Sequence, residues 1–424
     1  MSAFILYGVL SFMAITLILT GAILYVLYLV TPKRLCDIAI NDDPSLTKHV
    51  VAGRTLLDSL QGEGIAIPSS CGGKATCKQC RIRIGRGVEE PLETDVMSFS
   101  PKELREGWRL SCQVKVYHDL SVYVNEALLQ VREWHATVIS NENVASFVKE
   151  LVVQLESQES LDYHAGAFFQ IYAPPFTTNT SDWKVTIDPR FWSTWEEYGM
   201  FNRELDFSSH RQVSRAYSVA SYPEEGALLR FHVRIATPPL HDRKISRDIP
   251  WGCCSSYLFS LKPNDRIHLQ GPYGLSPIKK EAKQYIFLIG GVGSSFCRSH
   301  ILQMFRTEQT DARVSLWYGA RSLQENIHQK LYEDLERERS NFTYHLVLSA
   351  PTQADIDAGW DLHDPVKTNF LFKAFEIGAL KDMEYPEAAV YYVCGPPMHN
   401  KSVLQLLDTY GIPRDNIVVD EFCG

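Results

Sequence analysis

Four cysteines of this chain have the spacing of ligands to a metal centre. Cys71, Cys77, Cys80 and Cys112 form the pattern Cys-x5-Cys-x2-Cys-x31-Cys. The first interval contains two glycines and other small residues, which let the backbone wrap closely and point amide N–H groups at sulfur atoms. Such a loop holds either an iron–sulfur cluster or a zinc ion.

The grouping of the cysteines separates these two alternatives. A zinc site with four cysteine ligands usually presents two separate short Cys-x2-Cys pairs. Here three cysteines fall within ten residues and the fourth comes alone. This is the plant-type ferredoxin pattern with one extra residue in the first interval. We therefore predict a [2Fe-2S] cluster at the four cysteines, with a structural zinc site as the alternative.

Length and charge limit the kind of protein. With 424 residues, 45% of them apolar and 22% charged, the chain is long enough for about three folded domains. Its net charge of −8 and pI near 5.9 argue against nucleic acid as a partner, because phosphate binding needs a basic surface. Ten cysteines are too sparse for a secreted disulfide scaffold, so we expect the redox-active body in a reducing compartment.

The N-terminal stretch has the composition of a membrane anchor. Residues Phe4 to Val30 contain no charged side chain, and at about 1.5 Å per residue they can cross a hydrocarbon core of roughly 30 Å. A signal peptide is the alternative, but no basic region precedes the stretch and no small-x-small cleavage site follows it. Lys33 and Arg34 close the stretch, so the positive-inside rule leaves the body in the cytoplasm. We predict a single-pass anchor over residues 1–32.

Residues 35–129 have the pattern of a small α+β domain around the cysteines. TLLDSLQGEG predicts a short amphipathic helix ended by glycine, and RIRIGRG predicts a strand that turns at Gly85 and Gly87. A helix start is expected at Ser100-Pro101, followed by a final strand that carries Cys112. This order resembles a β-grasp ferredoxin.

Residues 130–277 predict a six-stranded antiparallel β-barrel. Strand-rich segments such as FVKELVVQL and FFQIYAP are interrupted by an inserted lobe at about 174–211. The aromatic residues from Trp183 to Tyr198 are expected to form the core of this lobe, with an electron path as the alternative. GPYG, residues 271–274, closes the barrel.

Two segments of the barrel suit a flat cofactor that carries phosphates. In RAYS, Arg215 can pair with a pyrophosphate, Tyr217 can lie against a flavin ring and Ser218 can hydrogen-bond the flavin edge. In GCCSSYLFSL, residues 252–261, a glycine and serines open a helix whose N-terminal amides would hold phosphate. The second segment adds weight to the first, because four residues alone are more often explained by an ordinary strand.

Residues 280–424 predict a doubly wound parallel α/β domain. QYIFLIGGVGSSFCRSHILQMF contains a buried strand, a glycine turn and a helix, with Gly290, Gly291 and Gly293 where a pyrophosphate approaches the backbone. The strands VSLWYGA, YHLVLSA and AVYYVCG follow, with helical segments between them. CGPPMHNKSVLQLL places Cys394 at the carboxyl end of a strand just before a helix, where such sheets bind ligands.

In this order, RAYS, GCCSS, GGVG, YGARS and CGPPM resemble the ferredoxin reductase family of flavoproteins. Within it, the anchor, the Cys-x5-Cys interval, the lobe before RAYS and the ending DEFCG are similar to the electron-entry subunits of bacterial sodium-translocating NADH:quinone oxidoreductases. The resemblance covers essentially the whole chain. It implies a protein of the bacterial inner membrane that takes electrons from NADH through FAD to the cluster. From there, electrons would pass to other membrane subunits of the complex and finally to quinone, coupled to Na⁺ export.

The resemblance also implies roles for matching positions. FAD would be bound by Arg215, Tyr217, Ser218, His232, Val233, Arg234, Gly252, Cys254, Ser255 and Ser256. NADH would be bound by Gly290, Gly291, Gly293, Arg321, Ser322, Cys394, Gly395, Pro396 and Met398. Phe422 would cover the flavin ring, and the catalytic residues would be Ser218, Cys394 and Phe422.

The chain departs from the resembled family after the glycine turn, and it also contains residues that bear on the choice between NADH and NADPH. The family's glycine turn usually continues to a proline and an arginine, whereas this chain has Phe296, Cys297 and Arg298, which leaves the glycine cradle intact. Arg321 could pair with a 2′-phosphate and favour NADPH, whereas Glu325 would oppose one. Because the resembled family uses NADH, we predict a preference for NADH.

Two other functions share some of these features. The soluble reductase component of an aromatic-ring oxygenase has the same three domains, but the anchor and the Cys-x5-Cys interval speak against it. A non-enzymatic, membrane-anchored metal-binding protein would need neither FAD nor NADH. A visible spectrum of the purified soluble part, from about residue 33 onward, would narrow these alternatives most.

Overall fold

The computed structural model describes residues 2–30, 34–69, 71–129, 131–157, 161–179, 183–201, 206–237, 240–241, 244–245, 251–274, 278–279 and 282–421. The chain divides into two compact units, Met1–Gln130 and Val131–Gly424. The first unit contains the four cysteines, and the second contains the segments predicted to bind FAD and NADH.

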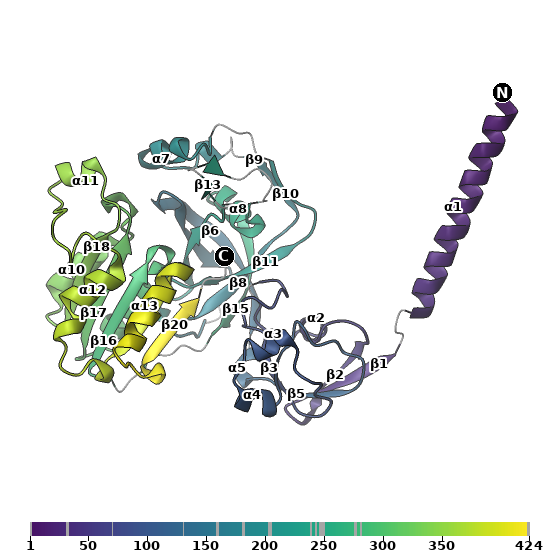
Figure 1. The fold of residues 1–424 in the computed structure, drawn as a ribbon, viewed down its shortest axis with the longest axis horizontal. Helices are drawn as coiled ribbons and strands as arrows, with labels where there is room; N and C mark the ends of the chain where they lie inside the picture. The colour runs from purple at the N-terminus through teal and green to yellow at the C-terminus, as the bar shows by residue number, and fades with distance from the viewer. Residues whose placement is uncertain are drawn as a thin grey trace. The chain divides into compact units, whose positions relative to one another are not determined.

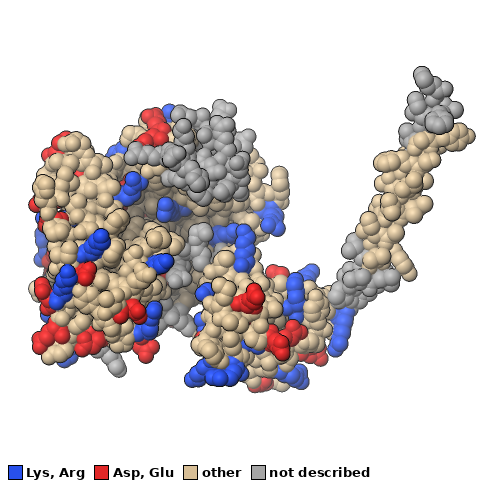
Figure 2. All heavy atoms as spheres, viewed as in Figure 1, with Lys and Arg blue, Asp and Glu red and all other residues tan. Residues whose placement is uncertain are grey.

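The N-terminal segment is one continuous helix, α1, which spans Ser2–Val30 (Figure 1). Among its described side chains, Tyr7, Phe12 and Ile18 are 72%, 71% and 70% exposed. The described part of α1 shows neither basic nor acidic side chains, whereas both are scattered over the described surface elsewhere (Figure 2). Within the described ranges, no helix combines the length and the apolar content that a membrane crossing requires.

A five-stranded mixed sheet forms the centre of the first unit. In spatial order its strands are β2 (Asp43–Val51), β1 (Leu35–Ile40), β5 (Leu120–Tyr123), β3 (Arg81–Ile84) and β4 (Trp108–Leu110). β1 and β5 are parallel, whereas the other neighbours are antiparallel. Alternate side chains of β1 face the core, so that Cys36, Ile38 and Ile40 are fully buried.

Short helices connect these strands, namely α2 (Leu56–Gly62), α3 (Glu93–Val96), α4 (Pro101–Arg105) and α5 (Glu126–Leu129). α2 begins where the sequence predicts, because the Thr55 hydroxyl accepts the N–H of Asp58 at 3.1 Å. α4 also begins as predicted, with a capping box formed by Ser100 and Glu103.

The position of Cys112 differs from the prediction that a strand carries it. β4 ends at Leu110, and Cys112 lies in the turn that follows. The turn forms because the Gln113 N–H donates back to the Leu110 carbonyl at 2.9 Å. The fourth cysteine is therefore presented by a turn beside the cysteine loop.

The second unit begins with a six-stranded antiparallel sheet. Its spatial order is β11 (Val213–Ser218), β8 (Phe168–Ala173), β15 (Arg266–Tyr273), β6 (Arg132–Ala145), β7 (Val148–Leu155) and β12 (Leu228–Arg234). A bridge between Val219 and Phe231 joins the chain after β11 to β12, and the Ala220 N–H donates to the Arg230 carbonyl at 2.7 Å. These contacts close the sheet on itself, which confirms the predicted barrel.

The chain between β8 and β11 forms a lobe beside the barrel. Its described elements are the hairpin β9 (Phe176–Asn179) and β10 (Asp206–Ser209), a 3-10 turn (Pro189–Phe191) and α7 (Trp192–Glu197). Trp183 and Trp195 are fully buried and belong to one apolar core with Leu151 and Phe231 of the barrel. The aromatic residues are a packing element, as predicted, but their core is continuous with that of the barrel.

Two further elements complete the barrel region. A two-stranded ribbon pairs β13 (Leu240–His241) with β14 (Lys244–Ile245). Helix α8 (Cys253–Ser260) contacts β8, β11 and β12. It therefore places the GCCSS segment next to RAYS.

A five-stranded parallel sheet follows. Its spatial order is β18 (Phe342–Leu348), β17 (Arg313–Ala320), β16 (Gln284–Gly290), β19 (Val390–Gly395) and β20 (Ile417–Glu421). The helices are α9 (Ser294–Leu302), α10 (Gln329–Glu338), α11 (Gln353–Asp357), α12 (Leu371–Gly378) and α13 (Pro397–Thr409) (Figure 1).

Helices cover both faces of this parallel sheet. Phe287 and Ile289 of β16 share a core with α9 and α10, whereas Ile286 and Leu288 share another with α12 and α13. Since successive side chains of a strand point to opposite faces, the two cores lie on opposite sides. The doubly wound arrangement predicted from the sequence is confirmed.

Of the residues after the glycine turn, Phe296 stands where the resembled family usually has proline and Arg298 keeps the usual arginine, and both fix α9 in place. Arg298 is buried, donates to the Ala220 carbonyl at 2.7 Å and forms a bidentate pair with Glu225 at 2.9 and 3.1 Å. Phe296 is buried with its ring centroid 4.1 Å from that of His300. Phe296 therefore fills the core under the glycine turn, and Arg298 fixes the helix to the barrel.

Candidate functional site

The four predicted metal ligands converge from one loop and from the turn after β4. Three of them are buried and one is half-buried: Cys71, Cys80 and Cys112, and Cys77. The loop is wound tightly, with a left-handed backbone at Gly72, Gly73, Ala75 and Lys78. This winding explains the glycines and small residues of the first interval.

The sulfur atoms form two pairs. The Sγ atoms of Cys71 and Cys77 lie 3.4 Å apart, and the thiol of Cys80 hydrogen-bonds with that of Cys112. Among the described residues, no three cysteine sulfurs lie within 4.8 Å of one another. A tetrahedral zinc ion needs all four sulfurs within about 4 Å of one another, whereas two irons can each take one pair. The donor set fits a [2Fe-2S] cluster better than zinc.

The surroundings of Cys71 and Cys112 favour the thiolate, the form in which cysteine binds iron. Burial raises the pKa of the Cys71 thiol, but hydrogen bonds from Cys77 and Thr76 outweigh it and lower that pKa to about 7. The hydrogen bond from the Cys80 thiol lowers the pKa of Cys112 to about 6, against the effect of burial. The same hydrogen bond, together with burial, raises the pKa of Cys80.

RAYS lies on β11, directly beside the start of α8. The hydroxyl end of Tyr217 is buried next to Cys254. The pKa of Tyr217 is well above its usual value, mainly because of burial and secondly because of Cys254. The Arg215 guanidinium donates to the Ser214 carbonyl at 2.7 Å and is half-buried. Tyr217, Arg215 and Cys254, all predicted to bind FAD, are therefore brought together.

The start of α8 requires glycine at position 252. A Cβ added to Gly252 would lie 2.5 Å from the Cβ of Ala236, and the Gly252 N–H donates to the Ala236 carbonyl at 2.8 Å. The hydroxyls of Ser255 and Ser256 each donate to the Gly252 carbonyl at 2.9 Å. The serines hold the helix start in shape, so a phosphate would be held by backbone N–H groups rather than by their hydroxyls.

The barrel and the parallel sheet meet at the ends of β11 and β20. The Ser218 hydroxyl donates to the Asp420 carboxylate at 3.2 Å, and Asp420 is the register partner of Cys394. Burial, followed by the Asp420 charge, raises the pKa of Cys394 well above its usual value, so its thiol is neutral. A Cβ added to Gly293 would lie 2.4 Å from the Cys394 carbonyl oxygen. Phe422, the third predicted catalytic residue, lies outside the described residues.

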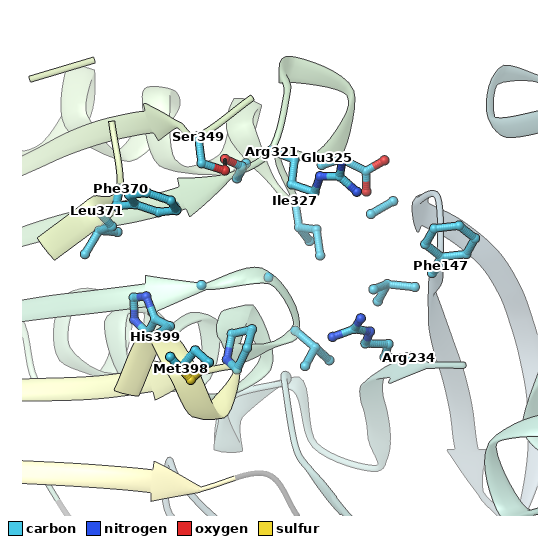
Figure 3. Close-up of a pocket in the computed structure, with 18 of the residues that line it drawn as sticks. Phe147, Arg234, Arg321, Glu325, Ile327, Ser349, Phe370, Leu371, Met398 and His399 are labelled. Atoms are coloured by element: carbon cyan, nitrogen blue, oxygen red, sulfur yellow. Dashed lines mark hydrogen bonds between the residues drawn. The ribbon is translucent and has the colours of Figure 1, made fainter. Parts of the chain in front are cut away.

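A cavity of about 650 Å³ lies at the carboxyl ends of the parallel strands (Figure 3). The chain leaves β16 toward β17 and β18 on one side and returns to β19 and β20 on the other, so the strand order reverses between β16 and β19. Gly290 and Gly291 line the cavity from the end of β16, and Pro396 and Met398 line it from the start of α13. Open α/β sheets bind ligands at such a reversal, which makes the cavity the candidate NADH site.

The structure separates the predicted nucleotide residues into two groups. Gly290, Gly291, Arg321, Pro396 and Met398 line the cavity, and Arg234, predicted to bind FAD, lines it as well. Gly293, Ser322, Cys394 and Gly395 are not among its lining residues, and neither are His232 and Val233 of β12. The roles of all these residues stay predictions.

Sequence reasoning missed several residues of the cavity wall. They include Phe147, Ser349, Phe370, Lys373 and His399. Phe147 lies in a hairpin turn of the barrel, and Phe370 lies just before α12 and is 62% exposed. Neither belongs to a motif or a periodic pattern, so only the tertiary structure brings them to the cavity.

Arg321 and Glu325 both line the cavity, but each also has a partner (Figure 3). The Arg321 guanidinium donates to the Tyr198 hydroxyl at 2.9 Å. The Glu325 carboxylate accepts the N–H of Ser146 at 3.1 Å and also the Ser146 hydroxyl. Glu325 therefore holds the turn between β6 and β7 while it places a negative charge at the cavity.

Three family models match consecutive parts of the chain. They describe a 2Fe-2S iron-sulfur cluster binding domain at residues 40–117, an oxidoreductase FAD-binding domain at 201–276 and an oxidoreductase NAD-binding domain at 287–403. The fold and these matches define an iron–sulfur flavoprotein oxidoreductase that uses FAD, a [2Fe-2S] cluster and NADH.

Curated relatives identify the family within this class. The chain is 52% identical over 99% of its length to the F subunit of the Na(+)-translocating NADH-quinone reductase of Chlamydia caviae, covering 98% of that protein. It is 37% identical to the corresponding F subunit of Mannheimia succiniciproducens, covering 99% of both chains. The chain belongs to the family of F subunits of the Na⁺-translocating NADH-quinone reductases.

Solved structures share the fold at low sequence identity. The Amycolatopsis cytochrome P450 reductase GcoB matches with a TM-score of 0.59 and 19% identity, over 91% of this chain and 98% of that one. The ferredoxin reductase in carbazole 1,9a-dioxygenase matches with a TM-score of 0.56 and 18% identity, over 92% and 99%. The likeness concerns the fold alone.

Proposed function

We propose that this chain is the subunit through which electrons from NADH enter a Na⁺-translocating NADH:quinone reductase. The observation that carries the proposal is the meeting of the barrel and the parallel sheet, where Ser218 contacts Asp420 beside Cys394. This contact brings the predicted flavin residues and the predicted nicotinamide residues to one place. When bound, FAD can take two electrons from NADH as a hydride and release them singly to an acceptor that takes one.

The residues at this meeting point hold the barrel edge in position and exclude water, and they do not themselves react. The Cys394 thiol is neutral and buried, so it would help to keep water from the reacting groups when FAD and NADH are bound. Ser218 and Asp420 set the position of the barrel edge relative to the end of β20. Gly290 and Gly291 leave the backbone accessible to a pyrophosphate at the cavity.

The test is the cofactor content and the absorbance of the purified protein. We expect two irons and one flavin for each chain, and NADH should bleach first the flavin and then the cluster absorbance. A preparation without flavin and iron would contradict the proposal. Membership in the reductase family favours this function over an oxygenase reductase or a non-enzymatic metal-binding protein.

We further propose that residues 1–32 anchor the protein as a single pass in the bacterial inner membrane, with the body in the cytoplasm. The support is the uncharged run Phe4 to Val30 within the single helix α1, followed by Lys33 and Arg34. For α1, the finding that no described helix could cross a membrane rests only on Tyr7, Gly8 and the 17 residues from Leu10 to Val26, because no other side chains of this helix are described. Protease added to intact cells should leave the body intact, whereas it should degrade the body in broken cells.

The partners proposed for the chain are other membrane subunits of the same complex, with quinone as the final acceptor. The support is the name of the relatives, which are subunits of an NADH-quinone reductase. Copurification of further membrane proteins with the tagged full-length chain, retained in detergent, is the expected result. A chain that is always isolated alone would contradict this part of the proposal.

A further inference from the structure

Glu150, His232 and His328 point three potential metal ligands at one another. Glu150 of β7 and His232 of β12 are cross-strand partners, and His328 precedes α10. The two histidine Nε2 atoms lie 2.9 Å apart, and the Glu150 Oε2 atom lies 3.3 Å from His232 and 3.2 Å from His328. Within the described residues, this is the one group of three such ligands whose atoms all lie within 4.8 Å of one another.

Hydrogen bonding alone leaves this cluster incompletely satisfied. Each Nε2 atom carries either one proton or one lone pair, and an ionised carboxylate only accepts. Two ring protons can serve at most two of the three contacts, so at least one contact always lacks a shared hydrogen. Because the cluster is mostly buried, such a contact costs stability. A cation between the three atoms would instead take one lone pair from each.

We propose that Glu150, His232 and His328 bind one divalent metal ion of the zinc type, which ties the FAD-binding barrel to the NADH-binding sheet. Zinc binds imidazole nitrogen and carboxylate oxygen at about 2.0–2.2 Å, so tetrahedral ligands lie about 3.3 Å apart. The three observed separations are close to this value. The site is distinct from the four cysteines, which belong to the other compact unit.

The surroundings hold the ligands in the orientation that a metal needs. The Nδ1 atom of His232 lies 2.7 Å from the Ser294 hydroxyl, which leaves Nε2 turned to the centre. The other oxygen of Glu150, Oε1, accepts from Arg230 at 3.1 Å.

Solvent reaches two of the three proposed ligands. The side chain of His232 is fully buried, but those of Glu150 and His328 are 15% and 18% exposed. Water can therefore complete the tetrahedron. Since the ligands come from β7, β12 and the segment before α10, the metal would join the two sheets without entering the NADH cavity.

The test is equilibrium dialysis of the full-length protein in detergent, with its cluster and flavin, against Zn²⁺. We expect one saturable zinc for each chain, with the iron content unchanged. His328→Asn should weaken zinc binding more than 100-fold, because asparagine suits the left-handed backbone at this position but is a poor zinc ligand. Glu150→Gln should weaken it similarly, and Ser294→Ala by about 10–100-fold.

The matched control is His363→Asn, at an exposed histidine of the same unit, which should bind zinc as the wild type does. Zinc should also raise the unfolding temperature of the wild type and of this control, but not that of His328→Asn. Three results would overturn the proposal: no saturable zinc in the wild type, equal affinity in His328→Asn, or a loss of iron equal to the zinc gained. If Glu150→Gln fails to fold, the His328→Asn variant still tests the proposal, because His328 is only half-buried.

Discussion

The cysteine loop and the candidate nucleotide cavity are built in opposite ways. All four predicted sulfur ligands lie within residues 71–112 of one small unit. The cavity takes its lining from residues 145 to 402, including a hairpin turn of the barrel, the inserted lobe and the ends of several strands. A metal centre can be specified by ligand spacing in a local segment, whereas a cavity of this size depends on how distant elements pack. The effects of substitutions in the cysteine loop should therefore stay within the first unit. The effects of substitutions around the cavity should extend to several elements of the second unit.

Replacing a cluster ligand should have the largest effect and the most confined one. We expect Cys77→Ala to abolish the cluster and all electron transfer beyond the flavin, while NADH still bleaches the flavin at close to the wild-type rate. Iron analysis and stopped-flow absorbance measure the two effects. Cys36→Ala, at a buried thiol in the same core, is the control and should keep its iron. Loss of flavin reduction in a folded Cys77→Ala protein would show that the two regions are not independent.

Breaking the contact between α9 and the barrel should destabilise the whole second unit. Arg298→Met leaves the half-buried Glu225 carboxylate with fewer partners, which should lower the free energy of unfolding by about 3 kcal/mol. Denaturant unfolding followed by flavin fluorescence measures this loss. Arg306→Met removes an exposed ion pair with Glu338 and should change stability little. Equal effects of the two substitutions would mean that the contact is not important.

Filling the glycine cradle should damage the cavity more selectively. A Cβ at Gly293 would lie 2.4 Å from the Cys394 carbonyl oxygen, so Gly293→Ala should cost about 1–3 kcal/mol of stability. It should also slow flavin reduction by NADH, because the backbone at the cavity must shift. Gly62→Ala, in a helix with no atom within 4 Å of the added Cβ, should be neutral or stabilising. Unchanged flavin reduction in Gly293→Ala would argue against the cradle.

The smallest expected effect concerns the choice of nucleotide. Glu325→Gln removes a negative charge from the cavity and should narrow the preference for NADH over NADPH by about tenfold or less. The kcat/KM for flavin reduction with each nucleotide measures the preference.

Glu325 also accepts two hydrogen bonds from Ser146, so a second variant separates its charge from its structural contact. Ser146→Ala removes the hydroxyl partner and keeps the carboxylate, and it should leave the preference unchanged. A kcat/KM with NADPH equal to or above that with NADH in the wild type would overturn the expected preference itself.

Local patterns in the sequence predict the ligand set of the cluster, and they were enough to define the order of the elements and the type of each sheet. Ligand spacing, helix caps and buried strand runs act over a few residues, so they are visible without tertiary contacts. The caps at Thr55 and Ser100 and the closed six-stranded barrel appear in the structure as the sequence predicts.

Which distant side chains meet was visible only in the folded chain. In the structure, Cys112 lies in a turn rather than in the predicted strand, and Glu325 accepts hydrogen bonds from Ser146. The aromatic residues of the lobe share one core with the barrel. The fold also brought Glu150 and His232 to His328, which is 96 residues beyond His232. Such contacts depend on barrel closure and on the packing of α9 against the barrel. Such contacts produce no periodic pattern in the sequence, because each joins single residues from segments that are far apart in the chain.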